Sequence, residues 1–80
     1  MLKITLKLFA DLRRHLPAGA DGHVAGLVVA PGSTAGDLLL SLGVSLGEEL
    51  IILVNGRHEE LGYELEEGDT LAVFPPLAGG

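Results

Sequence analysis

The sequence predicts an α+β fold, a mixed β-sheet with one main helix packed across one face. Several short runs alternate apolar and polar side chains with a period of two, the pattern of half-buried strands. Only residues 34–42 combine a capping residue, a leucine-rich face and a terminating glycine, as a helix requires. Because runs of strands surround this single helix, a sheet covered on one face is favoured over alternating βαβ units.

The composition limits the protein to a few functional classes. Eighty residues, of which 48% are hydrophobic, predict one domain with a small core. The sequence has no cysteine, which excludes disulfides, thiolate metal sites and a cysteine nucleophile. With no signal peptide at residues 1–4 and no membrane-spanning run, we expect a cytoplasmic protein. A formal net charge of −6 disfavours nucleic acid and anionic membranes as partners.

The first half of the chain predicts a β-hairpin. Residues 2–9 alternate, so that the apolar face carries Leu2, Ile4, Leu6 and Leu8 while Phe9 is an aromatic on the nominally polar face. Residues 10–16 are expected to form a helical turn, and residues 17–22 are rich in turn formers. Residues 23–30 then form the second strand.

The helix is expected to be short. Ser33 or Thr34 can cap it, with Asp37 completing a capping box. Gly43 is a natural terminator. The expected buried stripe is Leu38, Leu39, Leu40 and Leu42. A helix of this length, with Gly36 inside it, depends on tertiary packing.

Three further strands follow the helix. Residues 50–54 are the most apolar run and predict a central or well-covered strand. Asn55-Gly56 is a strong hairpin signal, and residues 57–61 are expected to return as a polar edge strand. After a turn at residues 66–69, residues 70–74 form the last strand.

The last seven residues suggest a presented tail. Pro75 and Pro76 must end the strand and favour an extended, stiff conformation. Gly79 and Gly80 have no side chains, so they can enter a narrow channel and offer a free carboxylate without steric hindrance.

The remaining polar residues do not form a catalytic motif. The three histidines are not at metal-ligand spacing, and neither a phosphate-binding loop nor a serine elbow is present. We therefore expect no catalysis by this chain alone.

Acidic residues are concentrated in the second half of the chain, where they form either ordinary solvated surface or a docking face for a basic partner. They are Glu48, Glu49, Glu59, Glu60, Glu64, Glu66, Glu67 and Asp69.

Five motifs resemble those of the β-grasp sulfur carriers of the MoaD/ThiS family, in particular the small subunit of molybdopterin synthase. They are Phe9-Ala10-Asp11-Leu12-Arg13, Pro31-Gly32-Ser33-Thr34 leading into Asp37-Leu38, Val54-Asn55-Gly56, Leu65-Glu66-Glu67-Gly68-Asp69, and Phe74-Pro75-Pro76 with Gly79-Gly80. The resemblance implies a ubiquitin-like β-grasp sheet of four to five strands. It makes residues 1–80 one sulfur-carrier domain with a flexible tail at residues 75–80. The double proline favours the molybdopterin branch over the thiamine branch.

The resemblance also implies a function and partners. An adenylating enzyme of the ubiquitin-activating type would use ATP and Mg²⁺ to activate the carboxylate of Gly80, and a sulfur-donating enzyme would convert it to a thiocarboxylate. The large synthase subunit would then take the tail into its active site; no cofactor is bound by the carrier itself. Because the chain has no cysteine, it can hold transferable sulfur only at this terminus. The implied partner-binding residues are Gly79, Ala78, Leu77, Pro76, Pro75, Phe74 and Phe9.

Other functions remain open at the level of sequence. The same tail is similar to that of small modifiers joined to lysines of other proteins through Gly80. It also suits a carrier for thiamine, tRNA thiolation or a tungsten cofactor. A β-grasp interaction module with an incidental Gly-Gly is the third alternative.

The two phenylalanines are expected to form a docking patch. By alternation, Leu71 and Val73 face the core, which leaves Phe74 on the opposite face. In a β-grasp sheet the first and last strands are parallel neighbours, so Phe9 would lie beside Phe74 at the root of the tail. Aromatic anchors commonly dominate interface energies.

Overall fold

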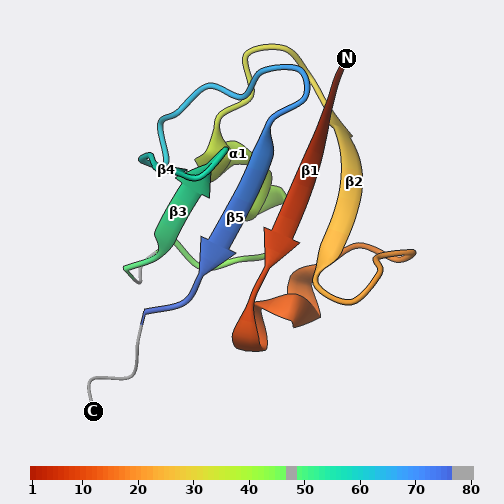
Figure 1. The fold of residues 1–80 in the computed structure, drawn as a ribbon, viewed down its shortest axis with the longest axis vertical. Helices are drawn as coiled ribbons and strands as arrows, with labels where there is room; N and C mark the ends of the chain where they lie inside the picture. Colours follow the sequence, from red (N-terminus) through yellow and green to blue (C-terminus); the bar gives the residue numbers. More distant parts are fainter. Residues whose placement is uncertain (47–48, 77–80) are drawn as a thin grey trace.

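The computed structural model describes residues 1–46 and 49–76, which form a five-stranded mixed sheet with one α-helix across one face (Figure 1). The strands lie in the order β2-β1-β5-β3-β4, and β1 and β5 are parallel while the other pairs are antiparallel. The elements are β1 (Leu2–Leu8), the 3₁₀-helix η1 (Ala10–His15), β2 (Val24–Val29), α1 (Ala35–Ser41), β3 (Ile51–Val54), β4 (Arg57–His58) and β5 (Thr70–Phe74). This is the expected β-grasp topology.

Strict alternation on the two inner strands builds the core. Leu6 and Leu8 of β1 and Leu71 and Val73 of β5 are fully buried beneath α1. The parallel register places Leu6 opposite Leu71 and Leu8 opposite Val73, so these four side chains form a continuous apolar surface for the helix. Burial of apolar area of this kind is the main favourable contribution to folding.

The helix begins as predicted, but it buries fewer leucine side chains than the four that were expected. The Thr34 hydroxyl accepts from the Asp37 N–H at 3.1 Å, and the Asp37 carboxylate accepts from the Thr34 N–H at 3.0 Å, which is the predicted capping box. Leu38 and Leu39 are buried, whereas Leu40 is 60% exposed. The expectation for Leu40 was wrong because a two-turn helix can direct only one narrow face at the sheet, and this position points away from it.

The hairpin after β3 also follows the sequence, but its return strand is short. Asn55 and Gly56 have φ values of +52° and +84°, as a type I′ turn requires. Only Arg57 and His58 pair with β3, where five residues were expected. After the Glu59 N–H donates to the Ile52 carbonyl at 3.0 Å, the chain leaves the sheet edge and turns towards the helix.

The loop at residues 59–65 packs directly on the start of α1. The N–H groups of Ala35 and Gly36 donate to the carbonyls of Tyr63 and Leu61 at 2.9 and 2.8 Å. The unpaired donors of a helix N-terminus are thus satisfied by backbone rather than by solvent. A Cβ at position 36 would lie 3.2 Å from the Leu61 carbonyl oxygen, so a larger residue there would require the loop to move by a few tenths of an ångström.

Asp69 is a buried structural residue, which corrects its expected place on the acidic surface. It is only 5% exposed, and its carboxylate accepts from the Asn55 amide at 2.9 Å, the Tyr63 hydroxyl at 2.9 Å and the Glu66 N–H at 2.8 Å. Asn55 in turn accepts from the Thr70 N–H at 2.9 Å. A buried carboxylate is tolerated here because three donors satisfy it.

These contacts shift the pKa values of Asp69 and Tyr63. Burial by itself would raise the pKa of Asp69, but the hydrogen bonds from the Glu66 backbone, Asn55 and Tyr63 outweigh it and lower that pKa below its ordinary value. Desolvation, followed by the hydrogen bond to Asp69, raises the pKa of Tyr63 to about 12.

Neither helix in the described ranges is long and apolar enough to cross a membrane.

We expect Asp69→Asn to destabilise the fold and to weaken its acid sensitivity. An amide cannot accept all three hydrogen bonds, and bonds to a charged group contribute about 1.5–3 kcal/mol each, so a loss of about 2 kcal/mol or more is expected at pH 7. Because the folded-state pKa is lowered, the stabilisation is present above the unfolded pKa and is lost as pH falls through the folded value.

Urea unfolding at a series of pH values measures both effects. The free energy of unfolding of the parent should begin to fall as the pH drops towards the ordinary pKa of an aspartate, about 3.9, and should fall further below it, whereas that of the variant should fall less steeply. Glu66→Gln, an exposed side chain beside the network, is the control. If the free energy of unfolding fell equally steeply with pH in the parent and in Asp69→Asn, the ionised carboxylate of Asp69 would not be the source of the acid sensitivity.

Gly36→Ala should destabilise the protein although alanine is the better helix former. Alanine gains about 1 kcal/mol of helix propensity, but forcing a methyl group into a filled site typically costs about 1–3 kcal/mol. We expect a net loss of about 1 kcal/mol in chemical denaturation. Gly26→Ala is the matched control, because a Cβ there would have no heavy atom within 4 Å. If Gly36→Ala were more stable than the parent, the loop at Leu61 would have to move away to make room for the methyl group.

Candidate functional site

The parallel pairing of β1 and β5 brings two phenylalanines together at one end of the sheet. Leu8 pairs with Val73, and the Phe9 N–H donates to the Val73 carbonyl at 3.2 Å. The rings of Phe9 and Phe74 are stacked, with centroids 4.3 Å apart and planes inclined by 7°. Since Leu8 and Val73 are fully buried under the helix, the half-buried rings lie on the opposite face, as the sequence predicted.

His23 extends this pair to three rings. Its centroid lies 4.7 Å from that of Phe9, with the planes inclined by 36°. We call Phe9, His23 and Phe74 the aromatic cluster. From the sequence, His23 is expected only to begin the second strand, because its spacing from the other histidines disfavours a metal site. The signal that could have found its role is the hairpin register, in which the Leu8 N–H donates to the His23 carbonyl at 2.9 Å.

The turn after β1 holds the Phe9 ring in place. Phe9 itself is extended, with φ −111° and ψ 160°, and caps η1, while the next residue, Ala10, has a φ of +54°. A left-handed alanine is unusual and persists only where its surroundings require it. The turn that contains it brings the Leu12 N–H to the Phe9 carbonyl at 3.1 Å and buries the Leu12 side chain.

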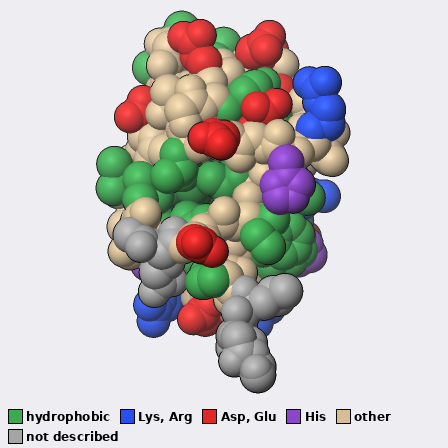
Figure 2. Space-filling model, turned by 90° about the vertical axis from the view of Figure 1, so that its left-hand side faces the viewer, with side chains coloured by type: hydrophobic (Ala, Val, Ile, Leu, Met, Phe, Trp, Pro, Cys, Tyr) green, Lys and Arg blue, Asp and Glu red, His purple; other side chains and the backbone are tan. Residues whose placement is uncertain are grey.

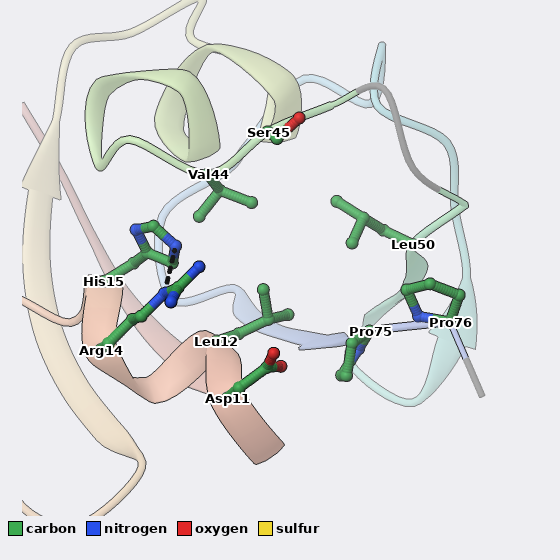
Figure 3. A pocket seen from close by; sticks show the side chains of 9 residues that line it. All are labelled: Asp11, Leu12, Arg14, His15, Val44, Ser45, Leu50, Pro75 and Pro76. Carbon is green, nitrogen blue, oxygen red and sulfur yellow. Dashed lines mark hydrogen bonds between the residues drawn. The ribbon is translucent and has the colours of Figure 1, made fainter. Parts of the chain in front are cut away.

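Behind the aromatic cluster, β5 ends at Phe74 and the chain continues through half-buried Pro75 and exposed Pro76. The two prolines border a hollow of about 370 Å³, shown in Figure 3. Asp11, Arg14 and His15 approach the hollow from η1, facing Leu50 and the prolines across it.

Arg14 Nε donates weakly to His15 Nε2 at 3.5 Å, so both side chains line the same wall (Figure 3). This wall therefore offers hydrogen-bond donors and a cationic group close to the root of the tail. Asp11 adds a carboxylate beside them, and Leu12, Val44 and Leu50 make the rest of the lining partly apolar.

The described part of the proposed site is thus Phe9, Phe74, Pro75 and Pro76, and the structure brings these four together. The other predicted site residues, Leu77, Ala78, Gly79 and Gly80, lie outside the described residues. Within residues 1–46 and 49–76, no cluster of three His, Asp or Glu side chains could hold a metal ion. Aromatic rings, prolines and a partly polar hollow thus lie together where β5 ends.

Comparison with known proteins gives a family match over almost the whole chain. The family described as Mut7-C ubiquitin matches residues 1–78. No curated protein matches the sequence.

Several solved structures of archaeal proteins have the same fold. Small archaeal modifier protein 1 of Haloferax volcanii is 30% identical, with 96% of this chain and 100% of that one covered and a TM-score of 0.75. A Pyrococcus furiosus protein assigned as molybdopterin converting factor, subunit 1, is 26% identical, with 96% and 100% covered and a TM-score of 0.72.

A ubiquitin of Caldiarchaeum subterraneum is 18% identical, with 99% and 98% covered and a TM-score of 0.57, and it supports the fold alone. Together these relatives confirm the resemblance to ubiquitin-like β-grasp sulfur carriers and modifiers.

Proposed function

The chain belongs to the Mut7-C ubiquitin family, and on this premise we propose that it is a sulfur carrier whose Gly80 is activated as an acyl-adenylate and converted to a thiocarboxylate. The proposed destination of the sulfur is molybdopterin, the precursor of the molybdenum cofactor. The chain would act as a non-catalytic subunit, because its described surface offers recognition groups rather than a catalytic set.

The observation that carries this proposal is the alignment of 96% of this chain, at 26% identity, with a Pyrococcus furiosus protein assigned as molybdopterin converting factor, subunit 1. The absence of cysteine supports a terminal sulfur, because no side chain can form a persulfide. In the proposed active form, the carboxylate of Gly80 is free.

The proposed chemistry takes place on the partner enzymes. A carboxylate oxygen of Gly80 attacks the α-phosphorus of ATP, and pyrophosphate leaves with Mg²⁺. Hydrosulfide supplied by a donor enzyme then attacks the acyl carbon. The new C–S bond replaces the C–O bond to AMP, which leaves with the bridging oxygen, and no reductant is needed. This chain contributes a tail thin enough to enter each active site, and water must be kept from the adenylate while it is there.

The root of the tail supplies the proposed grip for these partners. The stacked rings of Phe9 and Phe74 are half-buried and lie where Pro75 begins the tail. A partner that covers the aromatic cluster would remove apolar surface from water and hold the tail in one direction. The stiff prolines reduce the conformational entropy lost when the tail is inserted.

A second function is favoured by the modifier relatives. Small archaeal modifier protein 1 of Haloferax volcanii aligns over 96% of this chain at 30% identity. A modifier would use the same acyl-adenylate, but the acyl group would pass to a lysine amine and form an isopeptide bond. The surface at the tail serves both functions equally, so a chemical measurement must separate them.

Mass spectrometry of the protein purified from its own cells is that measurement. A carrier should show an intact mass in which one sulfur replaces one oxygen at Gly80. A modifier should instead leave Gly-Gly remnants on lysines of other proteins after digestion. A native protein whose chain continues past Gly80, without processing to that residue, would overturn both functions.

Deletion of Gly80, or addition of one residue after it, should abolish sulfur loading while the domain stays folded. The reacting group is the terminal carboxylate, and among the residues that the structure describes, those buried in the core lie between Ile4 and Val73. Thiocarboxylate formation with the activating enzyme, ATP and a sulfur donor is measured by intact mass, and circular dichroism checks the fold. Normal loading of the extended protein, with the added residue still present, would refute the role of Gly80.

Phe74→Ala should weaken association with both the activating enzyme and the large synthase subunit. The expected loss is about 2 kcal/mol or more, a typical value for a central aromatic contact, which corresponds to roughly thirtyfold in Kd. Val28→Ala is the control, since Val28 is exposed on β2 at the far edge of the sheet. If titration calorimetry gave the same affinity for the parent and for a folded Phe74→Ala variant, the aromatic cluster would not be part of the interface.

A further inference from the structure

A groove of about 520 Å³ lies beside β3 and β4, against the loop that follows them. Its floor is apolar, formed by Ile52, which is 3% exposed, and by half-buried Leu50 and Leu61. Figure 2 shows this side of the molecule, where hydrophobic side chains form a band bordered by acidic ones.

The rim of the groove is negatively charged. Glu49, Glu59 and Glu60 line it together with His58, and no lysine or arginine does. In the part of the chain that the structure describes, none of these three carboxylates takes part in an ion pair or accepts a hydrogen bond. Their charges are therefore free to pair with cations brought by another molecule.

The groove is held in shape by backbone hydrogen bonds. The Glu59 N–H donates to the Ile52 carbonyl at 3.0 Å, and the Tyr63 N–H donates to the Glu60 carbonyl at 2.9 Å. The Leu61 carbonyl accepts from Gly36 of the helix. Because these bonds fix the backbone at Ile52 and residues 59–63, an incoming segment does not have to order that part of the groove.

We propose that this groove docks a basic segment of a partner protein. One apolar side chain of the segment contacts Leu50, Ile52 and Leu61, and flanking lysine or arginine side chains pair with the glutamates. This occupant is favoured by charge complementarity. A negatively charged rim around an apolar centre fits a positively charged segment that carries one apolar side chain.

The other occupants fit less well. A second copy of the chain would bring another −6 of formal charge and a second set of glutamates against the first. An acidic segment or a nucleic acid would meet the same repulsion.

The groove is separate from the tail chemistry and does not depend on it. Leu50 nevertheless lines both the groove and the hollow beside Pro75 and Pro76. A segment bound in the groove therefore ends close to the root of the tail, and a partner that uses both surfaces can gain affinity from their proximity.

Binding is tested with a synthetic acetylated peptide of sequence Lys-Arg-Leu-Lys-Lys, titrated into ¹⁵N-labelled full-length protein and followed by amide chemical shifts. We expect saturable shifts that cluster at residues 50–52 and 58–62. A peptide with glutamate in place of every lysine and arginine should produce none, and one with serine in place of leucine should bind more weakly.

A charge-matched pair of variants separates local pairing from general attraction. Glu59→Gln with Glu60→Gln should weaken binding roughly threefold to tenfold, as expected for the loss of two exposed ion pairs. Glu64→Gln with Glu66→Gln removes the same charge outside the groove and should change the affinity less than twofold. Both pairs alter surface side chains, so the fold is expected to persist.

Four outcomes would overturn the proposal. They are shifts that map elsewhere or are absent, equal weakening by the two double variants, binding of the acidic peptide at the groove, and concentration-dependent shifts there without any peptide. The last result would identify a second copy of the chain as the occupant.

Discussion

The buried carboxylate of Asp69 is the interaction on which the arrangement of this small domain depends. Its three donors come from the β3–β4 turn, the loop after β4 and the turn before β5. Ionisation makes each hydrogen bond stronger, and the lowered pKa keeps the group charged at neutral pH. One side chain thus joins three segments, which the short strands β3 and β4 alone would hold weakly.

The loop at residues 59–65 transmits this constraint to the helix. Tyr63 donates its hydroxyl to Asp69, while its carbonyl accepts from the N–H of Ala35. A seven-residue helix is unstable alone in water, and here the loop satisfies its first donors while Leu39 packs on the sheet. The same loop forms one wall of the acidic groove, so fold stability and a rigid docking surface have a common origin.

At the other end of the sheet, parallel pairing of the first and last strands creates the root of the tail. Phe9 and Phe74 are 65 positions apart in sequence, yet β1 and β5 end side by side and stack their rings. The chain then leaves through two prolines between the aromatic cluster and a polar hollow. Leu50 lines both this hollow and the groove, so the two lie next to each other on one side of the molecule.

Local patterns were sufficient for much of the fold. The period-two alternation of β1 and β5, the capping box at Thr34 and Asp37, and the Asn55-Gly56 turn all appear in the structure because each is decided by residues close in sequence. Even the pairing of Phe9 with Phe74 could be predicted once the motifs indicated a β-grasp fold.

Contacts between distant segments decided the rest. The sequence does not distinguish buried Asp69 from the exposed glutamates beside it, because only the approach of Asn55 and Tyr63 supplies the donors that make burial tolerable. Exposure of Leu40, the short β4 and the ring of His23 likewise follow from packing across the domain. The sequence by itself determined the strands and the helix. The tertiary structure alone decided which charges lie inside and which surround an apolar groove, since desolvation depends on neighbours that are remote along the chain.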